Sequence, residues 1–191
     1  ILEKYESLIK ENKKIIGIGE IGLDYKAGCG LKKQEEIFKA MIGLAKKYNL
    51  PITIHNRVDP ELDKLASAQK ALEIIDEFYP DYRRVVFHCF SHQVGILEKI
   101  INKGGFISFS LNILRKSKKI LESLEACPLE NIIFETDSPY MKIKDDCSTP
   151  LDISKVYKRA AEINAIEKER LEGQVINNIK KVFGENGFLK I

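Results

Sequence analysis

The chain has 191 residues, of which 44% are hydrophobic and 31% are charged. Its 31 basic and 28 acidic side chains give a net charge of +3, far below that of a protein that coats nucleic acid. This composition is typical of a folded globular domain and excludes disorder. No apolar run approaches the ~20 residues of a membrane-spanning helix, so we expect no membrane partner.

The chain opens with a charged helical segment within residues 1–14, which lacks the pattern of a signal peptide. Five short runs rich in β-branched residues follow, each bounded by turn or polar residues. Most of them are apolar at consecutive positions, which is typical of strands buried on both faces of a parallel sheet. The predicted strands are residues 14–19, 51–55, 84–88, 105–109 and 131–135.

Segments with the helical period of 3.6 residues separate these runs. The predicted helices are residues 31–49, 66–79, 93–103 and 114–125, with two or three more within 152–184. Alternation of strands and helices predicts βαβ units with right-handed crossovers and one parallel sheet. We therefore expect a single α/β domain over residues 1–191.

Residues able to bind a metal or move a proton stand at the ends of the predicted strands. Glu20 follows the first strand, and His55 and His88 end the second and the third. Glu135 and Asp137 lie at the end of the fifth. The carboxyl ends of parallel strands face the same rim of a barrel or an open α/β sheet, where active sites lie. Imidazole together with carboxylate suits a divalent ion such as Zn, Mn, Fe or Mg, and the sequence does not choose among them.

Residues 17–22 also fit the G-x-G-x-x-G pattern of dinucleotide-binding sites. That pattern requires a helix directly after the glycines, so that its first amides meet the pyrophosphate. Here Gly28 and Gly30 break any helix before Leu31, and Glu20 would repel a phosphate. Dinucleotide binding is therefore the weakest of the alternatives.

The cysteines indicate a reducing compartment. No C-x-x-C pair occurs, so a structural zinc site has no support, and no secretory signal points to disulfides. We expect reduced thiols and a cytoplasmic protein. The four residues are Cys29, Cys89, Cys127 and Cys147.

Several motifs occur together in a fixed order along the chain. They are GEIGLDY at 19–25, a helix that contains Gln34, LPITIHNR at 50–57, FHCFS at 87–91, GFIS at 105–108 and FETDSPY at 134–140. With this combination the chain resembles the TatD family of metal-dependent deoxyribonucleases, in the amidohydrolase-like TIM-barrel group. The resemblance implies a (β/α)8 barrel.

The resemblance also implies roles for individual residues. Glu20 would bridge two divalent ions, His55 and His88 would bind one of them, and Asp137 would bind the other. Asp137 would also take a proton from the attacking water, which makes Glu20 and Asp137 the expected catalytic residues. Arg57 would either contact a phosphate of the substrate or face solvent in a loop. The ions, Mg, Mn or Zn, would support hydrolysis of phosphodiester bonds in DNA, in single strands or at ends.

Other residues near the rim receive minor roles. Asp24 and Glu135 would support the metal ligands. Phe90, Phe109 and Tyr140 would either stack on exposed bases or belong to the core.

The chain departs from the family pattern in its first part. The H-x-H pair of the family's opening strand is absent, since the only histidines are His55, His88 and His92. The five predicted strands would correspond to barrel strands four to eight, so we expect an incomplete, N-terminally truncated barrel with impaired activity. Its open sheet edges would favour self-association. His92 replaces a glycine of the family pattern and is expected to be a loop residue rather than a ligand.

Two other functions stay open. One is a metallohydrolase of the same barrel class that acts on small molecules, and the other is a remnant without catalytic activity. The cleavage of oligonucleotides but not of small esters would separate the deoxyribonuclease from both.

Overall fold

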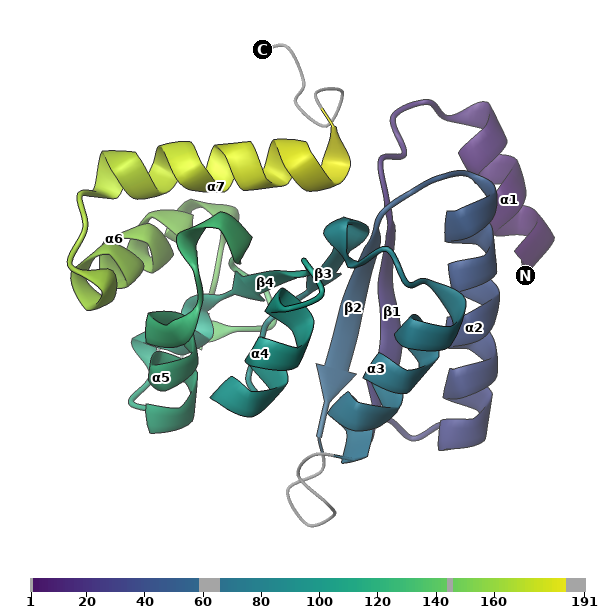
Figure 1. Ribbon diagram of the computed structural model, residues 1–191, viewed down its shortest axis with the longest axis horizontal. Coiled ribbons are helices and arrows are strands. Elements are labelled where there is room, and N and C mark those ends of the chain that lie inside the picture. The colour runs from purple at the N-terminus through teal and green to yellow at the C-terminus, as the bar shows by residue number, and fades with distance from the viewer. Residues whose placement is uncertain (1, 59–65, 144–145, 185–191) are drawn as a thin grey trace.

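Five parallel strands form the sheet of the computed structural model, which describes residues 2–58, 66–143 and 146–184 (Figure 1). The strands are β1 (Ile18–Asp24), β2 (Ile52–Arg57), β3 (Val85–Phe87), β4 (Phe106–Phe109) and β5 (Ile132–Phe134). Their order across the sheet follows their order in the chain. Doubly wound sheets reverse the strand order at a switch point, whereas a barrel adds each strand beside the previous one. The observed order is that of a barrel and confirms the predicted fold class.

A helix follows each of the first four strands, and Figure 1 shows the first three of these helices in succession beside the sheet. Two further helices follow β5, and one precedes β1. The helices are α1 (Leu2–Glu11), α2 (Leu31–Lys47), α3 (Ala66–Phe78), α4 (Val94–Ile101), α5 (Lys118–Ala126), α6 (Ile153–Asn164) and α7 (Lys168–Phe183).

The first strand differs from its prediction, because β1 begins at Ile18 and continues through Glu20 to Asp24. Ile21 and Leu23 are buried, and the register of β1 on β2 shifts between Ile18 and Ile21. This irregularity lets the strand continue beyond residue 19, where its end was predicted. The glycine-rich stretch therefore lies on a strand and does not open a helix.

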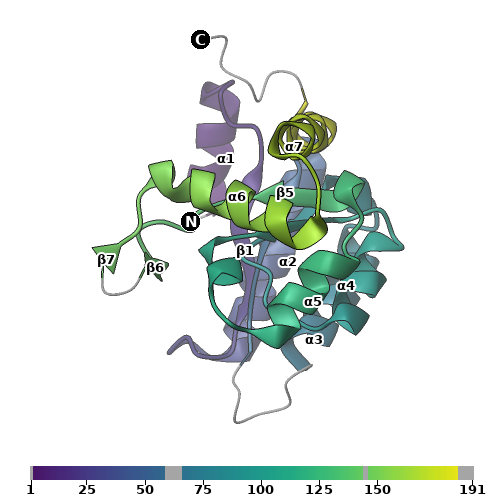
Figure 2. The ribbon, with the colours of Figure 1, turned by 90° about the vertical axis from the view of Figure 1, so that its left-hand side faces the viewer.

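Two other segments depart from the predictions. Leu111–Leu114 forms the 3-10 helix η2, because the Ser110 side chain accepts a hydrogen bond from the Asn112 amide, and α5 begins only at Lys118. An antiparallel hairpin of β6 (Lys142–Ile143) and β7 (Asp146–Cys147) was not predicted. It projects from the body of the molecule in Figure 2.

The two faces of the sheet carry different side chains, because successive residues of a strand point to opposite sides. Phe87 belongs to the main core, which the strands share with helices α2 to α7. Its neighbour Val86 belongs to a second cluster with Phe106 and Ile133, which Val182 of α7 covers. On this second face, apolar side chains lie near the amino ends of the strands. The polar side chains of the same face lie closer to the carboxyl ends.

The buried amide of Asn178 holds α7 against the sheet. It donates hydrogen bonds to the carbonyl oxygens of Leu129 and Ile132, each at 2.8 Å. These two contacts tie α7 to the backbone just before β5 and at its first residue.

Within the described residues, no helix is both long and apolar enough to cross a membrane. All four cysteines are free thiols.

Candidate metal centre

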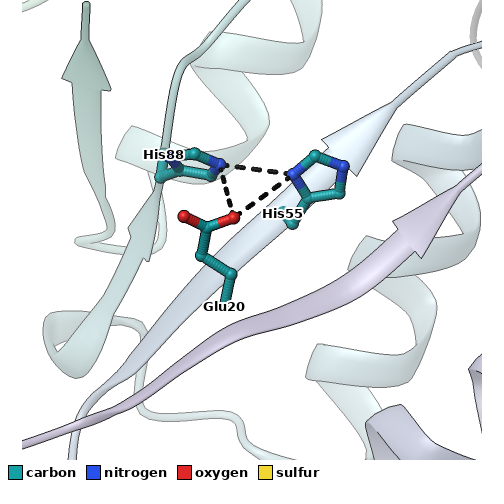
Figure 3. Close-up of side chains that lie close together, drawn as sticks. All are labelled: Glu20, His55 and His88. Atoms are coloured by element: carbon teal, nitrogen blue, oxygen red, sulfur yellow. Dashed lines mark hydrogen bonds and ion pairs between the residues drawn. The ribbon is translucent and has the colours of Figure 1, made fainter. Parts of the chain in front are cut away.

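Three side chains that can bind a metal meet on the second face of the sheet (Figure 3). Glu20 lies within β1, His55 within β2, and His88 directly follows β3. The Glu20 Oε2 atom is 3.2 Å from His88 Nε2 and 3.7 Å from His55 Nδ1. The two ring nitrogens are 3.3 Å apart. Residues from three neighbouring strands therefore converge on one point.

The spacing of these three atoms fits a single divalent ion. A point equidistant from atoms at these separations lies about 2.0 Å from each of them, which is the length of a zinc–nitrogen or zinc–oxygen bond. The His88 side chain is 5% exposed, whereas that of Glu20 is 52% exposed. The cluster is therefore open on the Glu20 side, as catalytic metal sites are and closed structural sites are not.

The remaining nitrogens of both histidines face carboxylates. His55 Nε2 is 3.3 Å from Asp24 Oδ2, and His88 Nδ1 is 3.4 Å from Glu135 Oε2. Since a carboxylate accepts a hydrogen bond, a proton on Nε2 of His55 and on Nδ1 of His88 would satisfy both contacts. The nitrogens that face Glu20 then carry lone pairs, which is the state that binds a metal.

Gln34 of α2 holds the end of β1, a role that the sequence did not reveal. Its Oε1 accepts a hydrogen bond from the Asp24 amide at 2.7 Å, and its Nε2 donates to the Asp24 carbonyl at 2.9 Å. A second donation reaches the Cys29 carbonyl at 3.0 Å. Gln34 thereby fixes the backbone that presents the Asp24 carboxylate to His55. A glutamine on an amphipathic helix gives no sequence signal of such a contact.

Gly22 permits the close approach of β1 to β2 beside His55, with which it pairs in the sheet. Its φ is +148°, and a Cβ atom at this position would lie 1.9 Å from the His55 carbonyl oxygen. Only glycine fits there, because any side chain would force the two strands apart.

Asp137 and Cys89 lie beside the cluster in left-handed backbone conformations, with φ values of 53° and 44°. Such values are uncommon outside glycine and are found preferentially at functional sites. Burial raises the pKa of the Cys89 thiol to about 12, so the thiol stays protonated, and its sulfur lies 3.2 Å from the Ser110 hydroxyl oxygen. Burial also raises the pKa of Asp137; the charge of His88 opposes this rise, and that of Glu135 adds to it.

The pKa of His88 reflects the same negative surroundings. Burial of the ring alone would lower its pKa, but the hydrogen bond to Glu135 and the charges of Glu135, Glu20 and Asp137 outweigh that effect. The pKa of His88 is therefore raised.

A cavity of about 720 Å³ opens beside the cluster, and its lining includes Glu20, His55, His88, Asp137 and Arg57. The structure thus brings the five predicted site residues to one cavity. Asp137 lies outside the group of three ligand atoms that is found among the described residues. Arg57 ends β2 and is exposed.

The remaining predicted residues divide between core and surface. Phe90 and Phe109 are buried, whereas Tyr140 is 84% exposed at the cavity. His92 lies in the loop between β3 and α4 and is buried outside the cluster. Burial lowers its pKa to about 4.

A barrel-type sheet on which imidazole and carboxylate side chains of neighbouring strands converge is typical of metal-dependent hydrolases. The family of TatD related DNases matches residues 1–184. The chain therefore belongs to the TatD family.

The relatives include hydrolases and nucleases. The uncharacterized metal-dependent hydrolase MJ1582 of Methanocaldococcus jannaschii is 35% identical over 187 residues, which are 96% of this chain and 69% of the relative. The 3'-5' ssDNA/RNA exonuclease TatD of Pantoea ananatis is 25% identical over 92% of this chain and 68% of the relative. Deoxyribonuclease TATDN3 of Homo sapiens is 27% identical over 96% of this chain and 63% of the relative.

Solved structures share the fold. The TatD homologue YJJV of Escherichia coli superposes with a TM-score of 0.85 at 22% identity, over 95% of this chain and 69% of YJJV. A TatD family hydrolase of Entamoeba histolytica gives a TM-score of 0.80 at 23% identity, over 95% and 67% of the two chains. At these identities the likeness concerns the fold.

Proposed function

We propose that this protein is a metal-dependent deoxyribonuclease that hydrolyses phosphodiester bonds in single-stranded DNA or at DNA ends. The convergence of Glu20 Oε2, His55 Nδ1 and His88 Nε2 at bonding distance from one point carries the proposal. The names of two relatives, an ssDNA/RNA exonuclease and a deoxyribonuclease, support the choice of nucleic acid as substrate.

Glu20, His55 and His88 would hold a divalent ion, Mg, Mn or Zn. Such an ion activates water and stabilises the charge that develops on a leaving oxygen. Asp137 would accept the proton of the attacking water, since its carboxylate lines the same cavity. Arg57 would bind a non-bridging phosphate oxygen through its guanidinium group and so orient the substrate.

A centre of two ions is part of this proposal. Glu20 turns one oxygen toward both histidines and is half exposed, so Glu20 and Asp137 would together hold the second ion. This second position has two candidate ligands in the chain, because the sequence contains no H-x-H pair.

A nuclease assay with a labelled single-stranded oligonucleotide tests the proposal. We expect cleavage with Mn²⁺ or Mg²⁺, none with a chelator, and a loss of at least about 100-fold in Glu20→Ala. Glu98→Ala is the matched control, because Glu98 is an exposed carboxylate on α4. Cleavage of small esters but not of oligonucleotides would favour the small-molecule metallohydrolase. Equal activity of Glu20→Ala and wild type would refute the proposed site.

Two further proposals concern the setting of the protein. The free thiols favour the cytoplasm. Self-association would use the edges of the sheet, since β1 and β5 each pair with one neighbour in the described sheet. A hollow of about 960 Å³ beside β1, lined in part by Leu2, Tyr5 and Ile37, offers apolar surface for such contact. Sedimentation analysis would reveal it as a mass that rises with concentration.

A further inference from the structure

A run of basic residues follows η2, with the sequence Arg-Lys-Ser-Lys-Lys at 115–119. Arg115, the first of them, lines the cavity of the metal cluster. It also lines a second hollow of about 530 Å³, to which Lys116, Lys118 and Arg159 contribute. Arg115 therefore stands at the boundary between the candidate reaction site and a basic surface formed by α5 and α6.

The charge of this second hollow is positive on balance. Its lining holds four cations and two carboxylates, Glu122 and Glu125. Lys118 pairs with Glu122 at 3.6 Å, but its side chain stays 88% exposed. In the described part of the chain, Arg115 and Lys116 have no carboxylate within ion-pair distance. Arg115 Nη2 instead lies 3.9 Å from the sulfur of Met141. The guanidinium group is thus available to an anion from solution.

Tyr140 lines the same metal cavity as Arg115. Its side chain is 84% exposed, and its neighbour Met141 is the residue that Arg115 contacts. An exposed aromatic ring and a guanidinium group that line one cavity present one surface for a base and one for a phosphate. Such a ring can stack on a base only when that base is not paired in a duplex.

We propose that the protein binds a single strand of DNA that leaves the metal cavity over Arg115 and continues along Lys116, Lys118 and Arg159. One base next to the reacting phosphate stacks on Tyr140. This inference rests on the proposed function and adds to it the path of the strand and the residues that favour a polymer over a small phosphoester.

The path has two measurable consequences. Affinity rises with the length of the strand, because phosphates beyond the metal cavity reach the lysines. Affinity also falls with salt, and each phosphate contact of a single strand contributes about 0.7 to the slope of log K against log salt. Loss of Lys116 and Lys118 should therefore lower that slope by about 1.4.

Fluorescence anisotropy with a labelled 12-nucleotide single strand tests the path in the presence of EDTA, where no cleavage interferes. We expect Lys116→Ala/Lys118→Ala to bind about tenfold more weakly at low salt, with the reduced slope. Tyr140→Ala should lose about fivefold to 100-fold, and Tyr140→Phe should retain binding. Lys13→Ala/Lys14→Ala removes the same charge from the loop that leads into the start of β1 and should bind as wild type does.

Several outcomes would overturn the path. They are wild-type binding that is undetectable, equal binding of the two double variants, equal binding of a duplex of the same length, and no gain from dinucleotide to 12-mer. These outcomes are separate from failure of the proposed function. If the protein binds the strand along this path but cleaves no oligonucleotide, the proposed nuclease activity is contradicted and the proposed path stands. If Lys116→Ala/Lys118→Ala cleaves strands of every length as wild type does, the proposed nuclease activity stands and the proposed path of the strand is contradicted. Circular dichroism of each variant confirms that it is folded.

Discussion

Replacement of Gly22 by alanine should separate β1 from β2 at the metal centre. The new Cβ atom would lie 1.9 Å from the His55 carbonyl oxygen, and a φ of +148° is strained for any residue other than glycine. Because the obstructing atom belongs to the backbone, rotation of a side chain cannot relieve the contact. The strands must therefore move apart where His55 presents Nδ1 to Glu20.

The cost can be worked out from the geometry. An ordinary contact requires the two strands to separate by more than about 1 Å, which exceeds what a hydrogen bond in the ladder tolerates. A non-glycine residue in this backbone region costs about 1–3 kcal/mol, and each lost hydrogen bond about 0.5–1.5 kcal/mol more. We expect Gly22→Ala to lower the free energy of unfolding by about 3 kcal/mol. Displacement of His55 should weaken metal binding by about 10-fold to 100-fold.

Gly43→Ala supplies the matched control. Gly43 lies within α2, and nothing lies within 4 Å of the position of its Cβ atom. Alanine should therefore stabilise the helix by about 0.5–1 kcal/mol. Urea unfolding in EDTA measures both changes in stability, and calorimetric titration with Zn²⁺ or Mn²⁺ measures the affinity. If Gly22→Ala unfolds at the wild-type urea concentration and binds metal equally well, the close approach of β1 and β2 at Gly22 supports neither stability nor the metal site.

Two pH-dependent predictions concern histidines. A metal binds only neutral His88, whose pKa is raised, so affinity for Zn²⁺ should fall about tenfold per pH unit below that pKa. Titration calorimetry from pH 8 to pH 5 would show this fall, and its onset should move to lower pH in Glu135→Gln, which removes a charge that raises the pKa. For His92, the pKa falls from 6.5 to about 4 on folding, so the unfolded chain binds a proton that the folded chain does not. The free energy of unfolding should therefore decrease by about 3 kcal/mol between pH 6.5 and pH 4 on account of this residue. His92→Leu should lack that part of the decrease in urea unfolding; an unchanged pH dependence would contradict the buried neutral state.

The sequence predicted the sheet because buried parallel strands are runs of apolar residues, a local property of the chain. It also predicted which strand ends carry polar residues, and His55 and His88 do lie on neighbouring strands. The extent of β1 escaped prediction because it depends on a contact between Gly22 and His55, far apart in the sequence. The backbone hydrogen bonds of Gln34 were not predicted for the same reason. Tyr140 was predicted either to stack on bases or to belong to the core, and the structure places it on the surface.

The electrostatics of the centre favour a bound cation independently of family membership. Four carboxylates, those of Glu20, Asp24, Glu135 and Asp137, surround the two histidines, and the ionic partners of the first three are these histidines. The raised pKa values of His88 and Asp137 both follow in part from this excess of negative charge. A structural network of ion pairs would balance the carboxylates with lysine or arginine, whereas a divalent ion among the three ligand atoms supplies the missing positive charge directly. Metal binding should therefore increase the free energy of unfolding and release a proton from His88, and both effects should disappear in Glu20→Ala.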